Sequence, residues 1–229
     1  MQSDMGVSLN LKKINRRHCI ALAATLALAG INTATAQTMT TPTPGPTILV
    51  LGDSLSAEYG LKRGSGWVAL LAQKLAAEKI PAKVVNASIS GDTTTGGRAR
   101  LAALLASHRP ALVVIELGAN DALQGLPVQL TQDNLNAMTQ AVQKTGAKVL
   151  LVGMQVPPNY GRDYSARFAK VYVDVAQARK TGLVPFMLKG VADVPDSLKW
   201  FQADRIHPLE AAHPIILGNI WPELKKVLR

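Results

Sequence analysis

Two patterns of apolar residues alternate along the chain. Short runs rich in Val, Ile and Leu fit strands that are buried on both faces of a parallel sheet. These runs are Ile48–Leu51, Val84–Asn86, Leu112–Leu117, Val149–Val152 and Leu183–Phe186. Between them, apolar side chains recur every three or four residues, as on one face of a helix. These positions are Trp67, Leu70, Leu71 and Leu75; Leu101, Leu104 and Leu105; Leu135, Met138 and Val142; Phe168, Val171, Tyr172 and Val175; and Ile216, Ile220, Leu224 and Val227. The alternation predicts an α/β fold, a three-layer α/β/α sandwich around a central five-stranded, mostly parallel sheet.

Residues 1–36 have the three parts of a cleavable secretory signal peptide. A basic start is followed by the apolar run Cys19–Gly30 and by the small residues Ala34–Ala36. We therefore expect cleavage between Ala36 and Gln37 and a periplasmic or secreted protein. The apolar run is shorter than the roughly 20 residues of a membrane span, so an uncleaved anchor and stable membrane insertion are not expected. The pair Arg16-Arg17 raises the twin-arginine export route, but its flanks fit the general secretory route better.

The rest of the chain divides into a short tether and one domain. Residues 37–46 are dominated by Thr and Pro and predict a disordered tether. Residues 47–229 show no internal repeat and are long enough for a single domain with one core. The only cysteine, Cys19, lies in the predicted signal peptide. The mature protein is therefore expected to have no disulfide, no thiolate metal site and no cysteine nucleophile.

Charge and composition restrict the partners of the protein. The formal net charge is +10 at neutral pH, but the basic residues are scattered and only 4% of residues are aromatic. Clustered cations with aromatics between them would indicate nucleic-acid binding, so we predict a solvated basic surface and no nucleic-acid partner. His, Asp and Glu nowhere have the spacing of a metal-ligand set, which predicts no metal, and we expect no cofactor. A monomer is the default expectation for a domain of this size.

Candidate chemistry gathers where the predicted strands end. Ser54, in the motif Gly52–Ser56, follows the first apolar run, Gly91 follows the second and Asn120 follows the third. In open parallel sheets, ligands bind outside the carboxyl ends of the strands. We therefore expect these three residues to lie at one edge of the sheet. Asp53 is expected to shape the turn that presents Ser54.

A second motif completes the set that a serine hydrolase requires. A serine hydroxyl is a weak nucleophile until a base takes its proton, and His207 is the obvious base. Asp204 lies three residues before His207, close enough on a turn to orient the imidazole. Gly91 and Asn120 are candidates to donate hydrogen bonds to an oxyanion. Each motif alone also fits a turn or a helix cap, but the combination predicts a serine ester hydrolase.

Five motifs resemble those of GDSL-type esterases and lipases of the SGNH hydrolase superfamily. More narrowly, they resemble the bacterial periplasmic group of thioesterase I, lysophospholipase and arylesterase. The motifs are Leu51–Ser56, Asn86–Thr94, Glu116–Asp121, Pro158–Arg162 and Asp204–Pro208, and together they extend over essentially the whole predicted domain. The resemblance implies a flavodoxin-like SGNH hydrolase fold. It also implies hydrolysis of small carboxylic esters, acyl thioesters or both, through an acyl-enzyme.

The resemblance implies roles for particular residues. Ser54 resembles the family nucleophile, His207 its general base and Asp204 the acid that orients the base. The backbone amides of Ser54 and Gly91, together with the Asn120 side chain, resemble the oxyanion hole. The stretch Val156–Tyr164 resembles a loop beside the acyl pocket that shifts on substrate binding. Its first residues are therefore candidates for substrate binding: Val156, Pro157, Pro158, Asn159 and Tyr160.

The chain departs from the family pattern at three positions. Ala119 and Arg205 stand where the family often has Gly, and His213 stands where Gln is usual. The methyl group of Ala119 could narrow the site. For Arg205 and His213 we expect surface variation without effect on a catalytic atom.

Two other functions remain as alternatives. One keeps the triad but acts on a carbohydrate O-acetyl group; a sugar groove needs exposed aromatic residues, and this chain has few. The other is a periplasmic binding module that has kept the fold without catalysis. The presence of Ser54, Asp204 and His207 argues against that alternative.

Overall fold

The structure, a computed structural model, describes residues 45–229. In this range the chain forms five strands, six α-helices and three short 3₁₀ helices, in alternating order. The predicted signal peptide and residues 37–44 of the predicted tether lie outside the described residues. The prediction of an α/β fold is confirmed.

The bounds of the elements follow the apolar pattern closely. The strands are β1 (Thr47–Gly52), β2 (Lys83–Asn86), β3 (Leu112–Glu116), β4 (Lys148–Val152) and β5 (Gly182–Val184). The α-helices are α1 (Trp67–Ala77), α2 (Thr94–His108), α3 (Ala119–Leu123), α4 (Val128–Lys144), α5 (Arg162–Arg179) and α6 (His213–Leu228). The 3₁₀ helices are η1 (Pro158–Tyr160), η2 (Ser197–Trp200) and η3 (Glu210–Ala212). The fifth strand ends earlier than predicted, at Val184, because the next residue, Pro185, has no N–H with which to continue a ladder.

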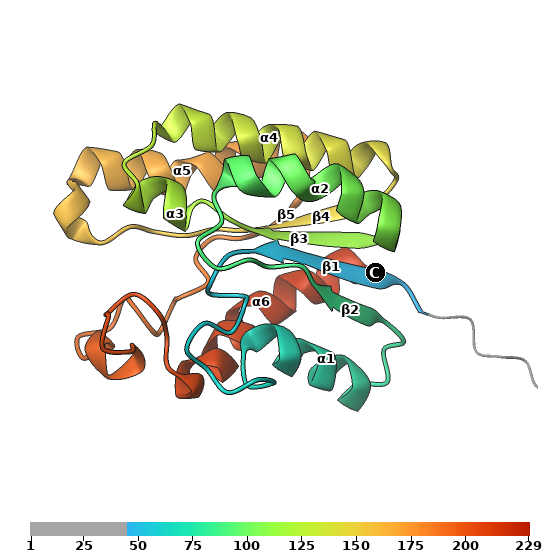
Figure 1. Ribbon diagram of the computed structural model, residues 1–229, viewed down its shortest axis with the longest axis horizontal. Helices are drawn as coiled ribbons and strands as arrows, with labels where there is room; N and C mark the ends of the chain where they lie inside the picture. The colour runs from blue at the N-terminus through green and yellow to red at the C-terminus, as the bar shows by residue number, and fades with distance from the viewer. Residues whose placement is uncertain (1–44) are drawn as a thin grey trace, which may run out of the picture. The chain divides into compact units, whose positions relative to one another are not determined.

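The five strands form one sheet in the order β2-β1-β3-β4-β5, and every neighbouring pair is parallel. Figure 1 shows α1 and α6 on one face of this sheet and α2, α4 and α5 on the other. The middle of β1 and of β3 is fully buried, which explains their continuous apolar runs. The predicted three-layer sandwich is therefore confirmed.

The order of the strands creates the crevice in which a site is expected. The chain leaves β1 to form β2 on one side and then returns to form β3 on the other side of β1. Such a switch separates the connections that follow the two strands and opens a crevice at their carboxyl ends. Ser54 follows β1 and Asn120 follows β3, so both residues lie beside this crevice.

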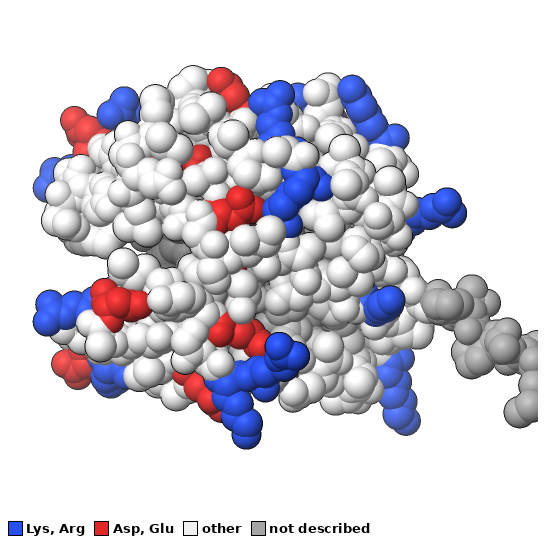
Figure 2. Space-filling view, in the orientation of Figure 1, with Lys and Arg blue, Asp and Glu red and all other residues white. Residues whose placement is uncertain are grey.

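Charged side chains are spread over the surface, as the sequence predicts. Figure 2 shows Lys and Arg distributed over the visible face, with Asp and Glu among them. The visible face carries no single large basic patch. Within residues 45–229, none of the helices combines the length and the apolar character needed to cross a membrane.

The expectation that His213 is a surface variation is wrong. Its side chain is only 1% exposed, and Nδ1 accepts a hydrogen bond of 3.0 Å from the backbone N–H of Trp67. Trp67 is the first residue of α1, and the N-cap residue Gly66 offers no side-chain acceptor. His213 at the start of α6 therefore satisfies an N–H that the helix itself leaves free. This hydrogen bond links the start of α6 to the start of α1.

We predict that His213 makes the fold sensitive to acid. Burial lowers the pKa of His213, so its imidazole is neutral in the fold and gains a proton more readily in the unfolded chain. Its contribution to stability is present above the usual pKa of about 6.5 and is lost as the pH falls below that value. His213→Gln keeps an acceptor for Trp67 but does not titrate. Thermal unfolding between pH 5 and 8 should show the variant gaining stability relative to the parent as the pH falls. A parallel pH dependence for both proteins would contradict the prediction, and His108→Gln serves as the control.

Candidate active site

Loops at the carboxyl edge of the sheet bring the candidate residues together. Ser54 lies in the turn after β1, Gly91 in the loop after β2, and Asn120 in the first turn of α3, after β3. Asp204 and His207 lie in the long connection between β5 and α6. The strands in Figure 1 point toward this edge, at the left of the view. Figure 2 shows a hollow in the surface on the same side.

Ser54, His207 and Asp204 form a continuous hydrogen-bonded chain. His207 Nε2 lies 2.9 Å from Ser54 Oγ, and His207 Nδ1 lies 2.7 Å from Asp204 Oδ2. The carboxylate fixes the tautomer in which Nδ1 carries the proton and Nε2 is free to accept one. This arrangement can remove a proton from the Ser54 hydroxyl and return it to a leaving group.

Asp204, the carboxylate in this series of hydrogen bonds, is itself held by hydrogen bonds within its own loop. Oδ1 of Asp204 accepts hydrogen bonds from the backbone N–H groups of Ile206 (2.9 Å) and His207 (3.0 Å). These bonds, with the side-chain bond to His207, lower the pKa of Asp204 to about 2. Asp204 therefore remains a carboxylate over the whole range in which the imidazole can work as a base.

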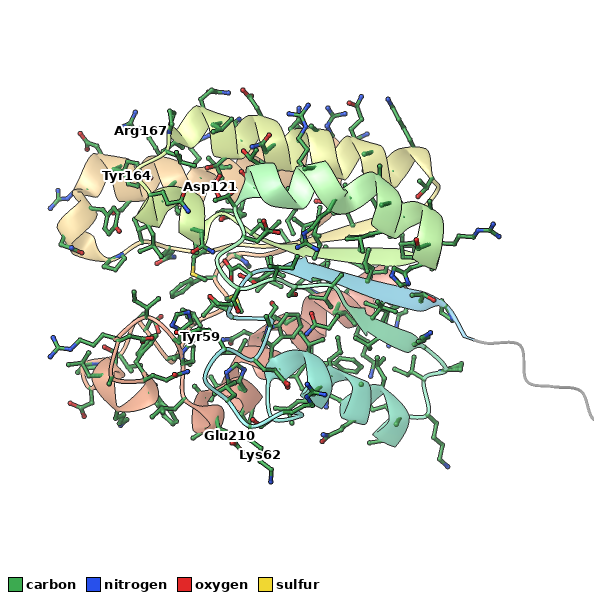
Figure 3. All side chains as sticks on the ribbon, in the orientation of Figure 1. Tyr59, Lys62, Asp121, Tyr164, Arg167 and Glu210 are labelled. Carbon is green, nitrogen blue, oxygen red and sulfur yellow. The ribbon has the colours of Figure 1, made fainter. Side chains whose placement is uncertain are left out.

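Tyr59, which the sequence analysis does not identify, packs on the imidazole. Its ring centroid is 4.3 Å from that of His207, with an angle of 36° between the planes. Figure 3 shows Tyr59 below the sheet at its carboxyl edge, with Asp121 above it. Tyr59 lies in the loop between β1 and α1. No local signal distinguishes it, because the contact depends on two loops that are distant in sequence.

Three groups can donate hydrogen bonds at this edge. The backbone N–H groups of Ser54 and Gly91 have no acceptor within residues 45–229. Gly91 has φ of +80°, a conformation that favours glycine. The Asn120 amide nitrogen donates to the carbonyl of Asp92 (2.9 Å) and to Oδ2 of Asp53 (3.2 Å). The predicted oxyanion donors are therefore on three loops around one crevice.

Two buried carboxyl groups lie behind these donors. Oδ1 of Asp53 accepts from the backbone N–H of Leu55 (3.0 Å), so Asp53 shapes the turn as expected. Glu116 is fully buried at the end of β3 and accepts from the Ser56 hydroxyl (2.6 Å). Burial raises the pKa of Asp53 to about 7, repulsion from Asp92 and Asp121 adds to this, and burial also raises the pKa of Glu116. The sequence analysis gave Glu116 no role, although an acid at the end of a buried apolar run is itself a signal.

The loop that carries Asn120 is fixed from two sides. The carboxylate of Asp121 accepts from the N–H (2.8 Å) and hydroxyl of Thr94, at the start of α2. The Tyr172 hydroxyl, on α5, donates to the carbonyl of Leu117 (3.0 Å). A buried hydrogen-bonded network of this kind costs free energy if any member is removed. It therefore holds the donors after β2 and β3 in a constant relation.

The predicted substrate-binding residues lie in the connection after β4, at the same edge. Val156 is half-buried against the core, and Asn159 is exposed. Tyr160 ends η1, and its ring lies 5.9 Å from that of Tyr164 on α5. A separate cavity of about 490 Å³ lies between residues 125–128 and α5. Tyr164 and Arg167, labelled in Figure 3, line it, whereas none of the candidate catalytic residues does.

Two further expectations concern Arg205 and bound metals. Arg205 is exposed and has φ of +60°, which explains why glycine suits this position; the expectation of surface variation holds for it.

Within the described part of the chain, no three His, Asp or Glu residues are grouped so that they could hold a metal ion.

Comparisons with known proteins agree with this geometry. Residues 50–215 match the GDSL-like Lipase/Acylhydrolase family. The chain is 56% identical over 182 residues to the esterase TesA of Pseudomonas aeruginosa, covering 80% of this chain and 89% of that protein. It is 43% identical over 182 residues to thioesterase 1/protease 1/lysophospholipase L1 of Escherichia coli K12, covering 80% of this chain and 85% of that protein. A crystal structure of TesA superposes with a TM-score of 0.76 at 55% identity, covering 79% of this chain and 99% of that one.

We predict that Gly118→Ala weakens both the fold and the site. Gly118 has φ of +125°, and an added Cβ would lie 2.3 Å from the Tyr172 hydroxyl oxygen. Relieving this contact requires the loop carrying Asn120 to move, at a cost of about 1–3 kcal/mol. Urea unfolding should show this loss, and kcat should fall with it. Gly125→Ala is the control for an ordinary left-handed φ, because Gly125 has φ of +67° but nothing within 4 Å of an added Cβ; at Gly118, the contact and a φ outside the left-handed region both add to the cost. Equal effects of the two substitutions would assign the loss to backbone strain alone.

Proposed function

Because the chain belongs to the GDSL-like lipase/acylhydrolase family and is an ester hydrolase, we propose that it cleaves acyl esters with Ser54, His207 and Asp204 as its catalytic triad. The observation that carries this proposal is the continuous chain from Ser54 Oγ through His207 to Asp204, with distances of 2.9 and 2.7 Å. No local motif requires the contact between Ser54 and His207, since these residues are 153 positions apart.

The triad supports acylation of the serine. His207 Nε2 takes the proton from Ser54 as the hydroxyl oxygen attacks the acyl carbon. Asp204 stabilises the imidazolium that forms and does not itself take the proton, which is consistent with its lowered pKa. The imidazolium then gives its proton to the leaving alcohol or thiol. The product of this half-reaction is an acyl ester on Ser54.

Deacylation repeats these steps with water. His207 accepts a proton from water, which attacks the acyl-enzyme, and then returns the proton to Ser54 Oγ. The backbone N–H groups of Ser54 and Gly91 and the side chain of Asn120 stabilise the negative oxygen in both half-reactions. Donors that are already oriented cost little reorganisation when the charge develops, which is why they lower the barrier.

The substrates we propose are carboxylic esters and acyl thioesters of small molecules. Two relatives are named esterase and thioesterase 1/lysophospholipase L1, and cleavage of either kind of bond by Ser54 passes through a tetrahedral intermediate to the same acyl-enzyme. The connection after β4, with Val156, Pro157, Asn159 and Tyr160, lies at the same edge as the triad. We assign the binding of the acyl group to this segment. Pro158 belongs to the same stretch.

The first test is hydrolysis of nitrophenyl esters from acetate to long acyl chains, and of matching thioesters. Ser54→Ala should lower kcat by several orders of magnitude, because it removes the nucleophile. Ser107→Ala, on the exposed side of α2, is the matched control and should behave as the parent. The chain length with the highest kcat/KM identifies the preferred acyl group. Hydrolysis by Ser54→Ala at the rate of the parent would refute the proposed triad.

We further propose that the protein is exported and that residues 1–36 are its signal peptide. The support is the sequence of these residues, since they lie outside the described structure. Expression of the full chain in a bacterium should give a periplasmic protein whose amino terminus is Gln37. Leu26→Arg, in the centre of the apolar run, should leave the protein uncleaved in the cytoplasm. An unprocessed chain in the periplasmic fraction would contradict the proposal.

A further inference from the structure

Asp53 and Glu116 are two buried carboxyl groups that the mechanism above does not use. Their side chains are 1% and 2% exposed, respectively. They are brought together by the register of the sheet, in which Gly52 of β1 pairs with Glu116 of β3. The two residues are in contact, since the backbone N–H of Asp53 donates to Oε2 of Glu116 at 3.3 Å. Two buried carboxyls in contact do not both ionise, since their charges would repel without screening by water.

The hydrogen bonds around the pair indicate which group keeps the proton. Oε2 of Glu116 accepts from the Ser56 hydroxyl (2.6 Å) and from the N–H of Asp53 (3.3 Å). This leaves Oε1 to carry a proton. The Ser56 hydroxyl is oriented for this bond, because it accepts from the Trp67 indole N–H at 3.2 Å. Glu116 thus has the surroundings of a neutral acid.

Asp53 has the surroundings of the charged partner. Its two oxygens accept from the N–H of Leu55 and from the Asn120 amide, and a proton on Glu116 provides a third donor. Hydrogen bonds to the charged form of a carboxyl favour that form. The other charged groups here are Asp92 and Asp121, which repel the charge. Arg100 lies 2.7 Å from Asp92 and offsets its charge.

We propose that Glu116 remains a neutral acid that donates its proton to Asp53, and that the carboxylate of Asp53 orients the amide of Asn120 toward the oxyanion. Both are positioning residues, since neither touches the substrate. The inference rests on the proposed role of Asn120 in the oxyanion hole and adds two residues to it.

The two hydrogen bonds of the Asn120 amide show what a charged acceptor at Asp53 contributes. One amide hydrogen is held by the carboxylate of Asp53, and the other is held by the neutral carbonyl of Asp92. A charged acceptor holds its hydrogen more strongly than a neutral one. The hydrogen on the Asp92 carbonyl is therefore the one that is exchanged for the developing oxyanion. Because Asp53 retains the other hydrogen, the amide only turns about this bond when its second hydrogen passes from the Asp92 carbonyl to the oxyanion.

The first experiment separates positioning from stability. Asp53→Asn removes the charge without changing the shape, so kcat on a nitrophenyl ester should approach that of Asn120→Ala, about 10²–10³-fold below the parent. KM should change by no more than about threefold. Thermal stability should not fall, because a buried carboxyl with a raised pKa costs free energy above pH 4. Asp133→Asn, on the exposed side of α4, is the matched control.

A double-mutant cycle connects the effect to Asn120. If Asp53 acts through Asn120, the combined variant Asp53→Asn with Asn120→Ala should be no slower than Asn120→Ala alone. Losses that multiply would overturn the inference, as would a kcat of Asp53→Asn within twofold of the parent. If Asn120→Ala is itself fully active, the oxyanion assignment fails and the inference fails with it. The proposed catalytic triad is tested separately, by the activity of Ser54→Ala.

The second experiment asks whether Glu116 is neutral. Gln has the shape of a protonated Glu and keeps a donor, so Glu116→Gln should retain kcat within about fivefold, whereas Glu116→Leu should lose as much as Asp53→Asn. The raised pKa of Glu116 costs stability as the pH rises above about 4.5, where the unfolded chain releases the proton and the folded chain does not. The Tm of Glu116→Gln should therefore rise relative to the parent from pH 4.5 to 8. A flat or falling difference over this range would show that Glu116 ionises in the fold and would refute the proposal. Glu223→Gln is the surface control.

Discussion

The whole site depends on the pairing of β1 with both β2 and β3. This pairing brings the ends of three strands to one edge, and the segments that follow them carry Ser54, Gly91 and Asn120. It also sets Gly52 opposite Glu116, so that the acid of one strand lies under the turn that carries Ser54. An added Cβ at Gly52 would lie 2.7 Å from a carboxyl oxygen of Glu116 and 2.7 Å from the Ser56 hydroxyl. Close approach of the two strand ends thus requires glycine at the entrance to the turn.

The fold and the main candidates could be predicted from the sequence because their signals are local. Continuous apolar runs mark buried strands, and the residues that follow such strands meet at one edge whatever the details of the packing. Ser54 could be named for this reason, whereas Asp204 and His207 were named from their spacing of three residues; the structure brings all three into hydrogen-bonding contact. The family match on residues 50–215 agrees with that interpretation.

What the sequence could not provide are contacts between distant segments. His213 was expected to be a surface variation at a position where the family usually has Gln; its role appears only when α6 packs beside α1. The stacking of Tyr59 on His207 likewise joins the loop after β1 to the loop before α6. The contact between Asp53 and Glu116 requires the register of β1 and β3. In each case the information lies in which elements become neighbours.

The short loop that holds Asp204 and His207 has a mechanical consequence. Asp204 fixes both the backbone and the ring of His207 through three hydrogen bonds within four residues, so that acid and base move as one rigid body. The His207 side chain of this body contacts the segment after β1 at two points, through Nε2 to Ser54 Oγ (2.9 Å) and through its ring to that of Tyr59. The geometry between Asp204 and His207 is set by hydrogen bonds within their own loop and does not depend on the position of Ser54. The Asp204–His207 pair is thus built by four consecutive residues, and only its placement against Ser54 depends on the rest of the fold.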